Sequence, residues 1–448
     1  MKKQKVLFTL AITIIATLTV TGCAGGSGSN PTGQTVVSEN IVSEDAVSEN
    51  TVSEDAISDD EVILSESGNG EIETEDTTPD QQLIETEEPD YFVPWEEAGL
   101  EDHVMDWQDE NLEAEMRIIT RIEDGDIMLS DVWEITELDL SCEDIQNIAA
   151  LGELTNLQQL DLVHNDISNI DALGKLVNLQ VLELFANQIS DISALKELTN
   201  LQQLTLGDND ISNIDALSNL TNLHELGLAY NYQISDISSL RELVNLQNLD
   251  LGLNQVSDIS ALSSLTNLQS LDLRYNQISD ISALSSLTNL QFLDLRKNPI
   301  SDIGILSGLV NLQGLGLGSN EIDDFSALEE LVNLQILHLY CSQIEDISVL
   351  SKLTNLQMLY LGENQIEDIS ALSELTNLQE LYLENNQIED ISALSELRNL
   401  QILNLEYNQI TDISVLPELK NLRELYLTGN PINDYSALNE MPMTHVEE

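Results

Sequence analysis

The sequence predicts an α/β solenoid, a fold in which one small unit repeats along the chain. An asparagine returns every 22 residues, as at Asn156, Asn178, Asn200 and Asn222, with one inserted residue before Asn245. A fixed period of this length is typical of repeat proteins whose single units are too small to fold alone. Apolar residues recur at the same positions of every unit, so stacking aligns them into one continuous core. We therefore expect about 14 turns of 22 residues.

Each unit predicts one short strand and one short helical turn, as in LTNLQSLDLRYNQISDISALSS from Leu265. Leu271 and Leu273 point inward from a parallel strand, and the residue between them points outward onto a sheet. The second asparagine, Asn276, lies where the chain leaves the sheet, and its amide can satisfy backbone groups of neighbouring turns. Asp280 suits the cap of a helical turn on the opposite face. These repeated positions are predicted to be scaffold rather than active-site groups.

The pattern LxxLxLxxNxI resembles a leucine-rich repeat, and the frame with LTNL and ISDISAL is similar to the internalin-type subfamily of bacterial surface proteins. The resemblance covers about Leu138 to Leu438. It implies a right-handed leucine-rich-repeat solenoid with a parallel sheet on the concave face, short helical turns on the convex face and a helical N-terminal cap. We assign residues 136–438 to the leucine-rich-repeat domain and residues 439–448 to a C-terminal tail.

The N-terminus predicts export. Three lysines precede the apolar run of residues 6–20, which is too short to span a membrane with its flanks and is typical of a signal peptide. The run ends in Val-Thr-Gly-Cys, which resembles the lipobox of bacterial lipoproteins. This resemblance implies a lipoprotein signal peptide over residues 1–22, lipidation of Cys23, and a protein anchored to the membrane at the bacterial cell surface. An ordinary secretory signal with an incidental cysteine is the alternative.

Residues 23–90 are predicted to form a disordered acidic tether. The series VVSEN, IVSED, AVSEN, TVSED repeats with a period of five, which matches neither a helix nor a strand. No lysine or arginine occurs between Cys23 and Arg117, so the segment is too polar and too like-charged to collapse. A partner-binding or glycosylated serine-rich stalk is the alternative.

Residues 91–135 are predicted to form the helical N-terminal cap, which resembles the cap that precedes internalin-type repeats. The first turn of a solenoid has an apolar end that must be covered. All three tryptophans, Trp95, Trp107 and Trp133, lie in this segment. The stretch DENLEAEMRIIT from Asp109 predicts an amphipathic helix with Leu112, Met116 and Ile119 at helical spacing, and Ser130-Asp131 suits the cap of a second helix. A carbohydrate platform built from the tryptophans is the alternative.

Charge and motifs exclude several classes of function. The chain has 80 acidic and 15 basic residues and a formal net charge of −65, which repels nucleic acid and bare anionic membrane. It contains no HExxH, GxSxG or P-loop motif, so we expect no enzyme and no cofactor. His338 and Cys341 lack the further ligands of a metal site, so we expect no metal.

The residues that vary between repeats are the candidates for binding. At the positions facing outward from the sheet, the N-terminal turns are acidic, whereas tyrosines concentrate in the C-terminal turns. Tyrosine is enriched at interfaces because it offers a large apolar area at little cost in entropy. Strand propensity alone would spread tyrosines evenly over the turns. The candidate ligand-binding residues of the concave face are Tyr340, Tyr360, Tyr382, Tyr407, Tyr426, His338, Arg274 and Arg296.

The glycines Gly314, Gly316 and Gly318 leave bare backbone in one turn, which suits either a partner's side chain or curvature of the sheet. The leading hypothesis is a lipid-anchored extracellular protein that binds a protein partner through its concave face. The alternatives are a binder of glycan or cell-wall polymer that uses the tyrosines, and a structural envelope protein without a defined ligand.

Overall fold

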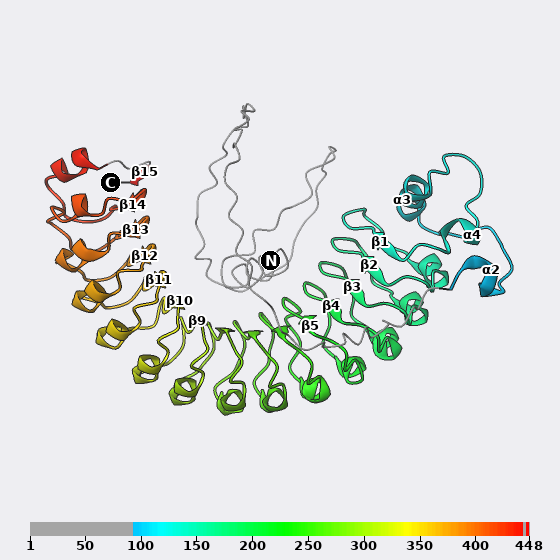
Figure 1. Ribbon diagram of the computed structural model, residues 1–448, viewed down its shortest axis with the longest axis horizontal. Coiled ribbons are helices and arrows are strands. Elements are labelled where there is room, and N and C mark those ends of the chain that lie inside the picture. Colours follow the sequence, from blue (N-terminus) through cyan, green and yellow to red (C-terminus); the bar gives the residue numbers. More distant parts are fainter. Residues whose placement is uncertain (1–92, 442–444, 448) are drawn as a thin grey trace, which may run out of the picture. The chain divides into compact units, whose positions relative to one another are not determined.

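The computed structural model describes residues 93–441 and 445–447. The expected signal peptide, Cys23 and the acidic tether lie outside the described residues. The repeats form one parallel sheet in which the strands follow sequence order. The strands line the inner side of an arc, and short 3-10 helices line its outer side (Figure 1). The predicted leucine-rich-repeat solenoid is therefore confirmed.

The strands are β1 (Glu137–Asp139), β2 (Gln159–Asp161), β3 (Val181–Glu183), β4 (Gln203–Thr205), β5 (Glu225–Gly227), β6 (Asn248–Asp250), β7 (Ser270–Asp272), β8 (Phe292–Asp294), β9 (Gly314–Gly316), β10 (Ile336–His338), β11 (Met358–Tyr360), β12 (Glu380–Tyr382), β13 (Ile402–Asn404), β14 (Glu424–Tyr426) and β15 (His445–Glu447). The 3-10 helices are η1 (Ala149–Glu153), η2 (Asp171–Lys175), η3 (Ser193–Glu197), η4 (Asp215–Leu217), η5 (Ser238–Glu242), η6 (Ser260–Ser264), η7 (Ser282–Ser286), η8 (Gly304–Gly308), η9 (Ser326–Glu330), η10 (Ser348–Lys352), η11 (Ser370–Glu374), η12 (Ser392–Glu396), η13 (Leu416–Glu418) and η14 (Ser436–Glu440).

The register of the sheet keeps equivalent residues side by side. Asp272 of β7 pairs with Asp250 of β6 and with Asp294 of β8. The extra residue of the fifth turn is absorbed before β6, because Gly227 of β5 pairs with Asp250, 23 positions later. Every outward-facing position therefore forms a column that runs along the concave face.

The core consists of the predicted leucine and isoleucine columns. Leu271 and Leu273 are almost fully buried and belong to one cluster that extends from the N-terminal cap to the last turns. Asn276 joins successive turns, as predicted. Its Nδ2 donates to the carbonyl oxygens of Leu251 at 2.9 Å and Leu273 at 3.1 Å, and its Oδ1 accepts from the Val256 amide at 2.9 Å. The buried backbone of this turn is thus satisfied by a side chain of the next.

The convex face repeats a short cap. Asp280 Oδ1 accepts a hydrogen bond from the backbone N–H of Ser282, the first residue of η7, at 2.8 Å. The same contact lowers the pKa of Asp280 because the donor favours the carboxylate. Equivalent contacts occur at Asp368 and Asp390, so this column holds the start of each helical turn as predicted, although Asp280 lies one residue before the N-cap residue, Ile281.

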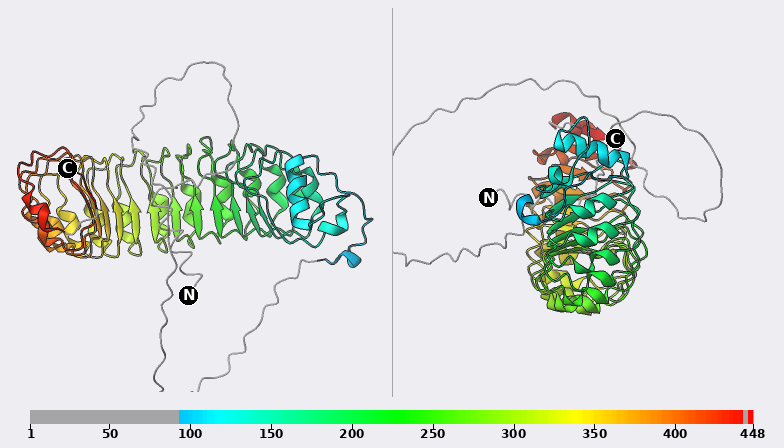
Figure 2. Two further views of the ribbon diagram at one scale, coloured as in Figure 1. Left: turned by 90° about the horizontal axis from the view of Figure 1, so that it is seen from above. Right: turned by 90° about the vertical axis from the view of Figure 1, so that its right-hand side faces the viewer.

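The N-terminal cap contains α2 (Trp95–Ala98), α3 (Glu110–Thr120) and α4 (Leu129–Val132), which lie at one end of the sheet (Figure 2). One oxygen of Asp109 caps α3 by accepting from Asn111 and Leu112. The other accepts from the amides of Gln146 and Asn147 in the first repeat at 2.9 Å. This carboxylate therefore ties the cap to the solenoid.

Two details of the cap differ from the sequence prediction. Ile119 is 40% exposed, although Leu112 and Met116 of the same helix are buried. The second helix, α4, begins at Leu129, so Ser130 lies inside it and donates to Asp102 instead of capping it. Asp131 does support this helix, since its Oδ2 accepts from the Met128 amide at 2.8 Å. Within the described residues, no helix has the length and apolar character needed to cross a membrane.

Candidate ligand-binding surface

Each turn has four residue positions near the concave face. In the turn of β7 these are Ser270, Asp272, Arg274 and, where the chain leaves the sheet, Tyr275. The last position has a positive φ in every turn that carries a tyrosine there, such as Tyr275 at 54° and Tyr407 at 51°. Variation at these four positions decides what the surface can bind, because the leucines between them are buried.

His338, Tyr360 and Tyr382 form a continuous stack of rings across β10, β11 and β12. The ring centroids of His338 and Tyr360 are 4.0 Å apart at an interplanar angle of 8°, and those of Tyr360 and Tyr382 are 4.6 Å apart at 5°. Burial raises the pKa of Tyr360 to about 12. The hydroxyl of Tyr382 donates to Glu380 at 3.1 Å, and that of Tyr426 donates to Glu424 at 3.1 Å.

An apolar patch that the sequence did not predict lies beside this stack. Phe292 and Ile336 are each 8% exposed and pack together, with Met358 and Tyr360 against them. Gly314 lies between Phe292 and Ile336 in the register, and its missing side chain lets them meet across one strand. The sequence contained a signal for this patch: Phe292 and Ile336 stand just before the first leucine of their strands, at a position that is polar in most turns.

The two candidate arginines are held in ion pairs with the acidic column. Arg274 Nε lies 3.2 Å from Asp272 Oδ2, and Arg296 forms a two-point contact with Asp294, with Nε at 2.9 Å from Oδ1 and an Nη at 2.5 Å from Oδ2. Both carboxylates are buried. Burial, together with its acidic neighbours, holds the pKa of Asp272 well above its usual range despite the arginine. The arginines therefore stabilise buried carboxylates on this face.

The glycine turn is filled by its neighbours rather than open. A Cβ on Gly316 would lie 2.6 Å from Asp294 Oδ1 and 3.1 Å from Arg296 Cγ. A Cβ on Gly318 would lie 2.6 Å from the carbonyl oxygen of Tyr340. The absence of side chains at Gly316 and Gly318 thus makes room for the ion pair and for a close approach of the next turn. This explanation of the glycines differs from the two expected from the sequence, a site for a partner's side chain and curvature of the sheet.

The remaining candidate residues differ in accessibility. Tyr340 is 37% exposed and Tyr407 is 56% exposed, whereas His338 is buried in the stack. Asn404 separates Tyr382 from Tyr426 in the column. The structure therefore brings His338, Tyr360 and Tyr382 into contact. Tyr340 lies in the same turn as His338, whereas Arg274, Arg296, Tyr407 and Tyr426 belong to other turns. Within residues 93–441 and 445–447, no three His, Cys, Asp or Glu side chains are grouped so that they could hold a metal ion.

Comparison with known proteins agrees with this geometry. The family model "Leucine Rich repeats (2 copies)" matches residues 155–197, 199–242, 244–286, 288–330, 310–352, 332–374, 354–396 and 398–440. An internalin (inlF) from Listeria monocytogenes is 35% identical, with 76% of this chain and 96% of that protein covered and a TM-score of 0.63. The chain belongs to the internalin-like leucine-rich-repeat proteins.

Other solved structures resemble this internalin-like chain less closely in sequence. The LRR protein LIC12759 of Leptospira interrogans is 27% identical, with 70% of this chain and 97% of that protein covered and a TM-score of 0.59. The TLR13–ssRNA13 complex is 27% identical, with 70% of this chain and 54% of that protein covered and a TM-score of 0.52. No match is found among curated proteins.

Proposed function

We propose that this internalin-like chain is a lipid-anchored extracellular recognition protein that binds a protein partner through the C-terminal half of its concave face. The observation that carries the proposal is the ring stack of His338, Tyr360 and Tyr382 beside the apolar patch of Phe292, Ile336 and Met358. Aromatic and apolar side chains gathered near the centre of a surface are the usual energetic anchors of a protein interface. No catalytic role is assigned to these residues.

The surroundings of the stack favour one kind of protein partner. Glu380 and Glu424 hold the tyrosine hydroxyls, and Glu384 lies on the same face with its pKa raised by burial and by neighbouring acids. A surface that places apolar rings among carboxylates suits a partner that presents apolar side chains ringed by lysine or arginine. Tyr340 and Tyr407, which are exposed, supply large amphipathic contact area at the border of this region.

The alternative of a glycan bound by the tyrosine row has weaker support. Sugars stack on the open faces of aromatic rings. The inner faces of His338, Tyr360 and Tyr382 are covered by one another in the stack. Mainly ring edges and hydroxyls are left for a ligand, and these suit a protein surface better.

Nucleic acid is also disfavoured. One related structure, the TLR13–ssRNA13 complex, contains single-stranded RNA. Binding of nucleic acid depends on neutralising phosphates with lysine and arginine. This chain has a formal net charge of −65, and the basic residues at the centre of its sheet, Arg274 and Arg296, are paired with Asp272 and Asp294.

Site-specific photo-crosslinking on intact cells tests the proposal. A photo-reactive phenylalanine analogue would replace Tyr340 or Tyr407, and matched controls would carry it at Phe185 or Ala186, the equivalent positions of an N-terminal turn. We expect the same protein adduct from both C-terminal positions and none from the controls. Adducts from the controls alone, or no adduct at all on cells that display the chain, would contradict the proposal.

A further inference from the structure

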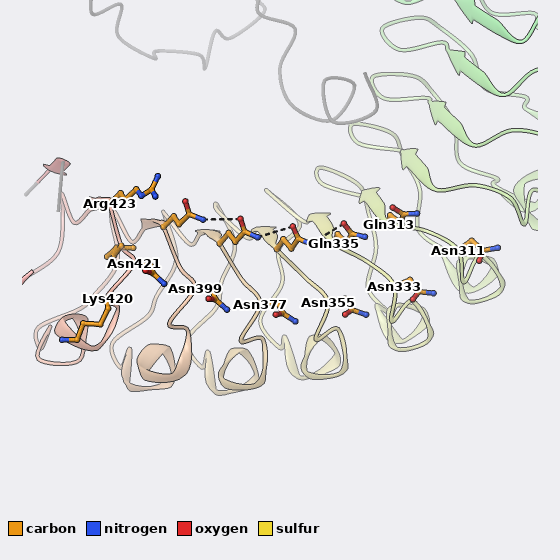
Figure 3. Close-up of a pocket in the computed structure, with 14 residues that line it drawn as sticks. Asn311, Gln313, Asn333, Gln335, Asn355, Asn377, Asn399, Lys420, Asn421 and Arg423 are labelled. Carbon is orange, nitrogen blue, oxygen red and sulfur yellow. Dashed lines mark hydrogen bonds between the residues drawn. The ribbon is translucent and has the colours of Figure 1, made fainter. Parts of the chain in front are cut away.

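A polar groove runs along the flank of the C-terminal repeats, outside the concave surface described above. Two columns line it between residues 311 and 423: asparagines such as Asn355 and Asn377, and glutamines such as Gln357 and Gln379 (Figure 3). The groove has a volume of about 1060 Å³. Asn377 and Gln379 stand just before β12, so the groove follows the segments that lead into the strands.

The glutamines are fixed in orientation by one another. Gln379 Nε2 donates to Gln357 Oε1 at 3.3 Å, Gln401 Nε2 donates to Gln379 Oε1 at 3.3 Å, and Gln357 Nε2 donates to Gln335 Oε1 at 3.5 Å. Figure 3 shows these amides in one row above the row of asparagines. A ladder of this kind holds each amide in place before a ligand arrives, which lowers the entropy lost on binding.

Hydrogen-bonding capacity remains in both rows. Gln357, Gln379 and Gln401 each use one Nε2 proton in the ladder, so the second proton of each is left for another acceptor. Asn355 and Asn377 each donate one proton to a carbonyl oxygen of the preceding turn, Val332 at 2.8 Å and Thr354 at 2.9 Å. Their Oδ1 atoms accept no hydrogen bond from the part of the chain that the structure describes. The groove therefore presents a row of spare donors, the glutamines, beside a row of spare acceptors, the asparagines.

The charge of the groove excludes some ligands. Among the residues that the structure describes, no carboxylate lines the groove, and Lys420 and Arg423 stand at one end of it, although the chain as a whole is strongly acidic. A polycation would find no partner there. A polyanion would meet positive charge only at that end and would be repelled by the rest of the molecule.

From these observations we infer that the groove binds a linear, uncharged polysaccharide. Sugar hydroxyls both donate and accept, as the free amide groups require. Successive turns of the groove are about 4.8 Å apart, close to the advance of one sugar ring in an extended chain. An extended peptide advances about 3.3 Å per residue, so its amides fall out of step with the rows.

The test is affinity electrophoresis of the full-length chain in native gels that contain mixed-linkage β-glucan, xylan, galactomannan or hydroxyethyl cellulose, with alginate as the charged comparator. We expect at least one neutral polymer to retard the protein. Replacing Gln357 and Gln379 together with alanine should weaken that retardation at least about tenfold, because two fixed donors are lost. The same change at Gln180 and Gln202, an equivalent amide pair outside the groove, should alter it less than about twofold.

Circular dichroism and melting temperature would show that both variants fold. No retardation by any neutral polymer, equal loss in the two variants, or stronger binding of alginate would overturn the inference. Binding of an extended peptide that is lost in the Gln357, Gln379 variant would assign the groove to peptides instead. Substitutions of Tyr340 and Tyr407 leave the groove intact, so failure of this inference can be told apart from failure of the proposed protein interface.

Discussion

The ring of His338 lies parallel to that of Tyr360, with centroids 4.0 Å apart, and only 8% of the histidine is exposed. Burial, with Arg296 nearby as a second cause, lowers the pKa of His338 to about 3. Histidine is therefore neutral in the stack at every physiological pH and acts as an aromatic ring rather than as a charged group. This relationship connects the acidic part of the column to its aromatic part, because Arg296 is paired with Asp294, which lies two strands from His338 in the same column.

The first prediction concerns the titration of His338. Followed by NMR, its ring signals should not shift between pH 8 and about 4, because the folded state binds no proton in that range. His103 is the internal comparison. Its Nε2 lies 3.0 Å from Glu153, and its pKa is raised, chiefly by a hydrogen bond to the Glu101 backbone, so it should titrate above the usual range. A His338 signal that titrates near its ordinary pKa would contradict the stacked, buried geometry.

The same shift affects stability. The folded-state pKa of His338 lies below the unfolded value, so the unfolded chain takes up the proton first as the pH falls from about 6.5 toward 3. Denaturant unfolding at several pH values should show that the free energy of unfolding of wild type falls, relative to that of His338→Gln, by up to about 1.4 kcal/mol per pH unit in that window. The raised pKa of Asp272 makes the folded state more stable as the pH falls. This effect is present in wild type and in His338→Gln, so it cancels when their free energies of unfolding are compared.

Much of the fold could be predicted from the sequence because one physical requirement recurs in every turn. Leu271, Leu273 and Asn276 each perform a role that the next turn repeats, so a single unit predicted the strand, the core and the inter-turn hydrogen bonds. The Asp280 cap followed for the same reason. The start of the second cap helix was harder to predict, because Ser130 donates hydrogen bonds to Asp102, a residue distant in the sequence, instead of capping the helix.

The candidate site was less predictable. The sequence placed His338, Tyr360 and Tyr382 in one column, but ring orientation depends on contacts between strands, so the stack was not foreseen. Phe292 and Ile336 were missed because they meet across Gly314, a contact between turns that skips one strand. The role of each candidate residue in binding remains a prediction.

A second prediction compares the two asparagine columns. Asn276→Ala should lower the free energy of unfolding by about 2–4 kcal/mol, because the Leu251 carbonyl and the Val256 amide lose a partner in the interior. Asn289→Ala should cost less than about 1 kcal/mol, since this exposed side chain makes one bond, to the Thr266 carbonyl. Denaturant unfolding measures both. Equal costs would show that burial does not distinguish the two columns.

A third prediction concerns the anchor, which lies outside the described residues. If Cys23 carries lipid, Cys23→Ala should release the chain into the medium or leave it unprocessed. Metabolic labelling with a fatty acid, followed by fractionation of cells, gives the readout. A Cys23→Ala chain that is still labelled would refute lipidation at this residue.

The remaining prediction compares the two ends of the concave face. One variant replaces Tyr360, Tyr382 and Tyr426 with serine. Its control replaces three acidic residues of the same column at the N-terminal end, Asp139, Asp161 and Glu183, with their amides. The tyrosine variant should lose about 1–3 kcal/mol in the free energy of unfolding, because two stacked ring pairs are removed. Its circular dichroism should be unchanged, because the leucine core is untouched.

The most direct test of the proposed interface is the dissociation constant of the crosslinked partner for these two variants and wild type, measured where all three are folded. Each truncated tyrosine that acts as an anchor should cost about 1–4 kcal/mol of binding, so the tyrosine variant should bind far more weakly, while the acidic variant keeps most of its affinity. The reverse order, or equal affinity of all three proteins, would contradict a binding site on the aromatic half of the sheet.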